Sequence, residues 1–362
     1  MARRRSLTPM RLRHVRRALE TERHGHGMFY GPLSRARLAA GDSLAPVHDR
    51  YRLRHADSGS ERELGFTPHA LGQLAAFAGV PMPFLERLPL ALGIAVLRGL
   101  VAARCVAGDS SFLFRVRDGS PPRIRAILPC TAPVVHDLEV FDDVASVVPE
   151  TVSASHVAVS EDVFHLRVLL RDVALELGDA ARPDEGMPGL DIRSSETGRY
   201  PLQVRAVVFR KVCSNGLTIM TASRRLFVGE GSSFDRMRFR EALQMTLETS
   251  VSRGRDLADR LRSSRSDYVK DPGREIRSLF RQHRLGNPRS EPARWVAAEL
   301  LRGASLFGVS RFEVVQAFTA VARGLEHDLR LRWEDAMAAY LLDGERPGED
   351  PEETETDAEE AA

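Results

Sequence analysis

The sequence has little lysine, cysteine and tryptophan, and it has no long uncharged hydrophobic run. Its three cysteines, Cys105, Cys130 and Cys213, lie far apart, which excludes a disulfide framework and a zinc-finger spacing. No uncharged stretch approaches the roughly 20 residues of a membrane span. The N-terminal Met-Ala-Arg-Arg-Arg lacks the apolar core of a secretory signal. We therefore expect a cytoplasmic protein with no membrane partner, no metal and no cofactor.

The positive charge rests almost entirely on arginine and is unevenly distributed along the chain. Lys211 and Lys270 are the only lysines among 52 basic residues. Residues 345–362 hold nine acidic side chains and one arginine, so this tail has a net charge of −8. Because the whole chain is at +2, residues 1–344 carry +10. The placement of the arginines is more informative than their number.

Arginine alternates with apolar residues in two adjacent segments, 112–117 and 123–128. Side chains of a strand alternate between its two faces, and the intervening Asp-Gly-Ser-Pro-Pro is typical of a turn. The pattern predicts a hairpin with an apolar face and a basic face. The apolar face would hold Phe112, Phe114, Val116, Ile124, Ala126 and Leu128, and the basic face Arg115, Arg117, Arg123 and Arg125.

Three further predicted strands, at residues 49–55, 163–171 and 201–212, repeat this alternation and extend the candidate basic face. Arginine forks suit phosphate groups, and an exposed Phe209 would stack a base. The alternative to binding is that this face is simply solvated, or that acidic helices cover it. The full candidate set for nucleic-acid binding is Arg52, Arg54, Arg115, Arg117, Arg123, Arg125, His165, Arg167, Arg205 and Lys211, together with Phe209.

The order of the elements predicts an α+β fold, with a mostly antiparallel sheet, N-terminal helices and a helical C-terminal region. Thr67-Pro68 and Gly79 mark a helix start and stop, Ser310 opens a capping box, and Asn215-Gly216 predicts a hairpin turn. Residues 178–200, rich in Gly, Pro, Asp and Ser, predict a long loop. We divide the chain into a basic helical arm (1–44), a sheet domain (45–230), a helical region (231–343) and a disordered acidic tail (344–362).

Four segments, taken in order, resemble a phage- and plasmid-related family of unknown function, domain-of-unknown-function family 932. They are Gly65–Leu74 with Gly79-Val80-Pro81, Ile124–Leu128, Ile192–Gly198 and Arg210–Leu217, and the likeness spans about residues 45–340. Pro129-Cys130-Thr131-Ala132 departs from the Ser-Asp-Arg-Tyr-like residues that the resemblance leads us to expect. The motif residues are Arg210, Cys213, Asn215, Gly216, Ser195, Glu196 and Gly198.

The resemblance implies a mobile-element setting, in which DNA replication and recombination are common tasks, and it implies no established activity. Our first hypothesis is non-specific binding or annealing of single-stranded DNA, with a homo-oligomer left open. One alternative is a scaffold protein whose basic face docks an acidic partner. Another is an enzyme centred on Cys213, for which His165 is the only plausible base. We expect binding rather than catalysis.

Overall fold

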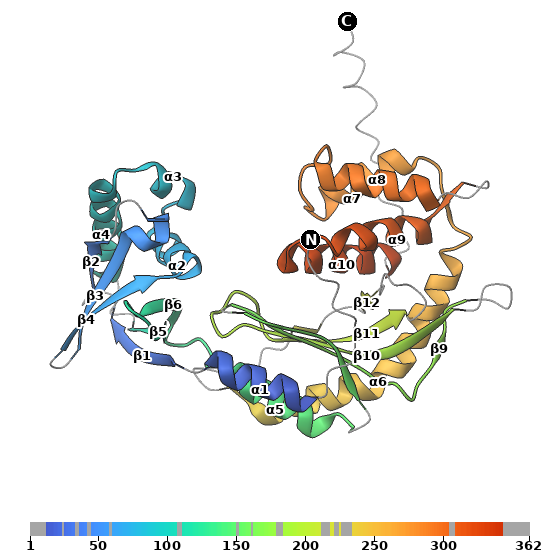
Figure 1. Cartoon of the computed structure of the whole chain (residues 1–362), viewed down its shortest axis with the longest axis horizontal. Helices are drawn as coiled ribbons and strands as arrows, with labels where there is room; N and C mark the ends of the chain where they lie inside the picture. Colours follow the sequence, from blue (N-terminus) through green and yellow to red (C-terminus); the bar gives the residue numbers. More distant parts are fainter. Residues whose placement is uncertain are drawn as a thin grey trace, which may run out of the picture.

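The computed structural model folds the chain into two lobes, each built around its own β-sheet (Figure 1). It has the α+β class that the sequence predicts. The described residues are 12–23, 25–32, 36–41, 45–57, 60–106, 111–149, 152–160, 162–178, 184–210, 218–220, 224–225, 234–303 and 308–342.

The first lobe contains a six-stranded sheet with the strand order β1-β5-β6-β4-β3-β2. Neighbouring strands are antiparallel, except for the parallel pair of β4 and β6. The strands are β1 (His26–Pro32), β2 (Ala36–Ala40), β3 (Tyr51–Asp57), β4 (Ser60–Phe66), β5 (Ser111–Arg117) and β6 (Arg123–Pro129), with a short 3-10 helix, η2 (Val47–Arg50), before β3.

Three helices, α2 (Pro68–Ala78), α3 (Met82–Arg87) and α4 (Leu90–Val106), cover one face of this sheet. The Thr67 hydroxyl caps the start of α2 by accepting from the Ala70 amide, and Gly79 ends the helix in the left-handed region. Both helix signals in the sequence are confirmed. The core under the helices is apolar, and it includes Leu53, Phe66, Leu74 and Phe114.

The second lobe contains an antiparallel sheet with the order β12-β11-β10-β8-β7, to which two short strands add. The short β12 returns antiparallel to β11, which is the direction that the sequence predicts. The expected Asn215-Gly216 turn itself lies outside the described part of the chain. The strands are β7 (Ser153–Val159), β8 (Phe164–Leu169), β9 (Leu175–Glu176), β10 (Glu185–Ser194), β11 (Gln203–Arg210), β12 (Thr218–Met220) and β13 (Arg224–Arg225).

Helices cover both faces of the second sheet, which lies between two helical layers in Figure 1. The apolar side chains of β8, β10 and β11 pack on α1, α5 and α6, and the opposite face meets α10. The capping box at Ser310 is present at the start of α9. The helices are α1 (Leu12–Arg23), α5 (Asp137–Val147), α6 (Arg236–Ser263), α7 (Pro272–Gln282), α8 (Glu291–Gly303), α9 (Arg311–Ala322) and α10 (His327–Leu342), and a two-stranded ribbon joins β14 (Tyr268–Val269) to β15 (Val309–Ser310).

Three local predictions are wrong. Residues 26–40, assigned to a helical arm, supply β1 and β2, so only Leu12–Arg23 of that arm is helical among the described residues. The predicted loop at 178–200 contains β10, the strand between β8 and β11. A bulge also shifts the β5–β6 register, so Ala126 and Leu128 lie with Leu113 on the face opposite Phe114.

Candidate functional site

One face of the first sheet, which we call the open face, is the side turned away from α2–α4. The pairings Arg37 with Arg54 and Arg117 with Arg123 place each pair on one side of the sheet, because directly opposed residues share a face. Gly65 connects the two pairs, since it is opposite Arg123 and the same register brings it opposite Arg52. The open face is defined by Met28, Tyr30, Arg37, Arg52, Arg54, Arg117 and Arg123.

The outer part of this face is accessible and partly ion-paired. Arg54 is half exposed and pairs with Glu63 at 2.9 Å. Arg123 is partly exposed and pairs with Asp49 at 2.9 Å, whereas Arg52 donates to the carbonyl oxygens of Asp49 and Tyr51. The prediction that Arg52, Arg54, Arg117 and Arg123 share a face therefore agrees with the strand register.

The inner part of the same face is sealed, which corrects the prediction for Arg115 and Arg125. Both guanidiniums are buried, and both reach one carboxylate of the second lobe, Glu196, with N–O distances of 3.3 and 3.1 Å. Arg115 also donates to the Val135 carbonyl, and Arg125 contacts His26. Neither arginine is available to a phosphate on the surface.

Glu196 belongs to a buried acidic pair whose two pKa values move apart. Burial acts to raise the pKa of Glu196, but His136 and the two arginines outweigh it and hold the pKa below its usual range. Burial, and then the negative charge of Glu196, raise the pKa of the neighbouring Asp137 to about 7. The Asp137 amide donates to Glu196 Oε1 at 3.1 Å. The ionised Glu196 carboxylate is thus the counter-ion of both Arg115 and Arg125.

Three predicted basic residues of the second sheet, His165, Arg167 and Arg205, are also buried, and they lie under α10. Asp191 on β10 accepts from His165 at 2.6 Å, from Arg167 at 3.0 Å and from Arg193 at 2.9 Å. Two carboxylates of α10 complete what we call the buried charge layer. It consists of His165, Arg167, Asp191, Arg193, Arg205, Glu334 and Asp335.

The prediction that Arg167, Arg205 and His165 project from an exposed surface is therefore wrong. Glu334 holds Arg167 at 3.0 Å, and Asp335 holds Arg205 at 2.5 Å. The physical reason is that a strand pattern shows which side chains share a face but not what covers that face. Covering by an acidic helix was the alternative reading of the pattern, and α10 is that helix.

The cations of this layer keep its buried carboxylates ionised. Burial acts to raise the pKa of Asp191, but His165, Arg193 and Arg167 hold it well below its usual value. Burial lowers the pKa of His165 to about 4 even though Asp191 opposes the shift. Glu334 keeps a lowered pKa beside Arg167 and Arg330, despite its burial. Glu334 and Asp335 were not predicted as partners of these arginines, because their only signal in the sequence was a position within the helical C-terminal region.

A cluster of three histidines lies at one end of the buried charge layer. His156 on β7, His165 on β8 and His327 at the start of α10 have ring centroids 4.8 to 5.7 Å apart. Their ligand atoms lie within 4.8 Å of one another. The sequence pattern did not predict this group, because the three positions are separated by up to 171 residues.

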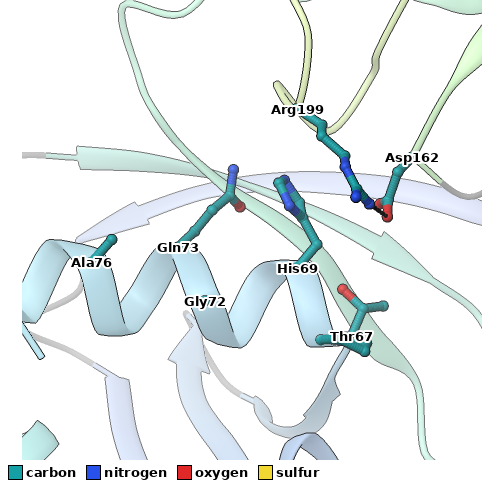
Figure 2. A pocket seen from close by; sticks show the side chains of 8 residues that line it. Thr67, His69, Gly72, Gln73, Ala76, Asp162 and Arg199 are labelled. Carbon is teal, nitrogen blue, oxygen red and sulfur yellow. Dashed lines mark hydrogen bonds and ion pairs between the residues drawn. The ribbon is translucent and has the colours of Figure 1, made fainter. Parts of the chain in front are cut away.

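An open pocket of about 580 Å³ lies where the two lobes meet (Figure 2). Its walls are the start of α2, with His69 and Gln73, and the second-lobe residues Asp162 and Arg199. His69 and Gln73 both contact the Thr197 carbonyl at 3.0 Å, and Arg199 pairs with Asp162 at 3.2 Å. These contacts fix the loop that carries Glu196 against the first lobe.

The residues of the family motif fall into two groups. Ser195 donates to the Asp162 carbonyl, and Gly198 adopts a φ of +74° beside Leu128, so the 195–198 segment is a structured junction between the lobes. Phe209, which was expected to be exposed, is half-buried on β11 of the second sheet and so does not lie on the open face. Lys211, Cys213, Asn215, Gly216 and the side chain of Arg210 lie outside the described residues, as does the acidic tail.

No family model, curated protein or solved structure matches the chain. The likeness to the phage- and plasmid-related family therefore stays a prediction. Among the helices of the described residues, none combines the length and apolar character that crossing a membrane requires.

Proposed function

We propose that this protein binds single-stranded nucleic acid, most simply DNA, without sequence preference on the open face of the first sheet. The observation that carries the proposal is the gathering of five arginines from four strands, Arg37, Arg52, Arg54, Arg117 and Arg123, on a sheet face that the helices of its lobe do not cover. The proposed site is smaller than the sequence suggested, because four of the predicted arginines are buried, two in the covered part of this face and two under α10.

One aromatic and one sulfur-containing side chain are exposed on the edge strand of the same face. Tyr30 and Met28 on the edge strand β1 are 51% and 47% exposed, and their register opposite Leu113 and Arg115 places them on the open face. An exposed tyrosine ring on the same sheet face as guanidinium groups is a combination that single-stranded sites use for stacking and phosphate contact. A double helix needs no such ring, so this pair favours single strands.

The size of the face sets the length of the probe. Six strands at about 4.8 Å spacing give a width of roughly 24 Å, which a segment of a few nucleotides crosses. A fluorescently labelled 20-residue oligo-dT therefore covers the face. Anisotropy titrations of the full chain from 50 to 300 mM salt measure both the affinity and its electrostatic part.

The expected salt dependence follows from the number of phosphate contacts. If four arginines each neutralise one phosphate, log K falls with log salt at a slope of about −3, from the coefficient of about −0.7 per contact on single strands. Removal of residues 345–362 removes eight negative charges net and strengthens binding at low salt. Absence of binding at 50 mM salt, with and without this tail, would overturn the proposal and favour a protein partner instead.

Charge reversal locates the binding surface. The double variant Arg54→Glu with Arg117→Glu changes the charge of the open face by four units, so we expect a loss of affinity of at least 10-fold. Arg87→Glu with Arg98→Glu is the matched control, because it also changes the charge by four units and both arginines are exposed on α3 and α4, over the opposite face of the same lobe. Arg115 and Arg125 are unsuitable for this test because both are buried against Glu196.

A further inference from the structure

The three-histidine cluster has the donor set of a transition-metal site. His156, His165 and His327 come from two strands and a helix, and their ligand atoms converge within 4.8 Å. We propose that these three imidazoles bind one Zn²⁺ or a similar first-row divalent ion and leave one coordination position open. Imidazole suits zinc, cobalt, nickel and copper, whereas magnesium and calcium prefer oxygen donors.

The environment of His165 is the strongest support. Its Nε2 faces Asp191 Oδ1 at 2.6 Å, which leaves Nδ1 for another partner, and Nδ1 is buried with no hydrogen-bond partner among the described residues. A metal-bound histidine typically donates its other ring N–H to a carboxylate, which fixes the tautomer and the orientation of the ring. Asp191 fulfils this role, and a metal ion would satisfy the orphaned nitrogen.

The three imidazoles are packed closely together and have positively charged neighbours. Burial, then the neighbouring His165 and Arg167, lower the pKa of His156 to about 2, and burial lowers that of His165 to about 4. Arg330 also faces the group from α10.

Carboxylates neutralise most of the positive charge near the cluster, so it repels a metal cation less than the arginines alone would. Glu334 accepts from Arg167 at 3.0 Å and from Arg330 at 2.8 Å, and Asp191 accepts from Arg167 as well. The surrounding guanidiniums nevertheless favour an anionic group, such as hydroxide, at the open position. His156 and His327 are only partly buried, so the site has a route to solvent.

Only small ring movements convert the cluster into a metal site. Tetrahedral zinc with Zn–N bonds of about 2.0–2.1 Å separates its nitrogens by about 3.3 Å. The widest distance of 4.8 Å must therefore shorten by about 1.5 Å. Rotation of the half-buried His156 and His327 rings supplies this change while Asp191 keeps His165 in place.

The test uses the tag-free full chain after treatment with EDTA. Titration with Co²⁺ should produce a saturable visible absorption at one ion per chain, and Zn²⁺ should displace it. Zn²⁺, but not Mg²⁺, should raise the melting temperature, because the ion joins α10 to β7 and β8. Lack of saturable one-to-one binding of both Co²⁺ and Zn²⁺ would overturn the proposal.

Two variants and one control assign the ligands. His156→Gln and His327→Gln should each weaken Zn²⁺ binding by at least 100-fold. His48→Gln should leave it unchanged, since His48 is also half-buried beside a carboxylate but lies in the first lobe. Equal affinity in all three variants would refute the assignment. X-ray absorption of the zinc-loaded wild type counts imidazole ligands independently of the folding of any variant, and fewer than three would also refute it.

The outcome is separable from the proposed nucleic-acid binding. Two of the histidines lie on the second sheet and the third at the start of α10, whereas the open face belongs to the first sheet. Binding of oligo-dT in the presence of EDTA reports on the open face alone, so either proposal can fail without the other.

Discussion

Replacing Glu196 by glutamine tests whether this single carboxylate neutralises two buried arginines. Glutamine keeps the shape of the side chain and can still accept from the Asp137 amide, so the variant removes mainly charge. Arg115 and Arg125 are 3% and 2% exposed and would remain buried without their counter-ion. Breaking a buried pair in this way costs about 3–5 kcal/mol of the free energy of unfolding.

A matched variant at an exposed ion pair shows how much stability is lost when the pair is not buried. Glu63→Gln removes the partner of Arg54 at the similar distance of 2.9 Å, but both side chains are about half exposed. An exposed pair contributes about 0–1 kcal/mol. Differential scanning calorimetry should show a melting temperature lower by on the order of 10 °C for Glu196→Gln and by a few degrees at most for Glu63→Gln. Equal, small shifts would refute the reasoning that Glu196 is the counter-ion of both arginines.

Three further predictions concern the junction and the open face. The pKa of Asp137 is raised from 3.8 to about 7, so between these pH values the folded state holds a proton that the unfolded state has released, and stability falls as pH rises. In urea titrations, the free energy of unfolding of Asp137→Asn should rise relative to that of the wild type by up to about 1.4 kcal/mol per pH unit in that window. A difference that does not change with pH would contradict the shift. Gly198→Ala should cost about 1–3 kcal/mol in the same assay, because φ is +74° and the new methyl would meet Leu128; an unchanged midpoint would contradict this. Tyr30→Ala should weaken oligo-dT binding by about 5- to 100-fold through lost stacking, whereas Tyr268→Ala, equally exposed in the other lobe, should not.

The sequence predicted the local elements better than their environment. Helix α2 between Thr67 and Gly79, and the capping box at Ser310, follow from backbone hydrogen-bonding rules that act over a few residues. The alternation along β3 and β5 likewise placed their arginines on one side of a sheet. The bulge between β5 and β6 could not be read from the alternation, because it depends on how two strands pair.

What covers a face depends on contacts that are remote in sequence. Arg167 meets Glu334 across 167 residues, and Arg125 meets Glu196 across 71. A strand pattern carries no information about such partners. β10 was missed because its glycine, proline and aspartate are typical of loops, yet Asp191 lies at the centre of the buried charge layer. The cluster of three histidines was not predicted for the same reason, since only the packing of α10 on the sheet brings His327 to His156 and His165.

Photocrosslinking tests the central claim, that the open face is the nucleic-acid surface, most directly. An oligo-dT carrying 4-thiothymidine is irradiated with the full chain, and the crosslinked peptides are identified by mass spectrometry. We predict crosslinks in β1 and β5, at Tyr30 and Met28 and near Arg117, that disappear in the Arg54→Glu, Arg117→Glu variant. Crosslinks confined to the second lobe, for example to the arginine-rich helix α6, would contradict the account.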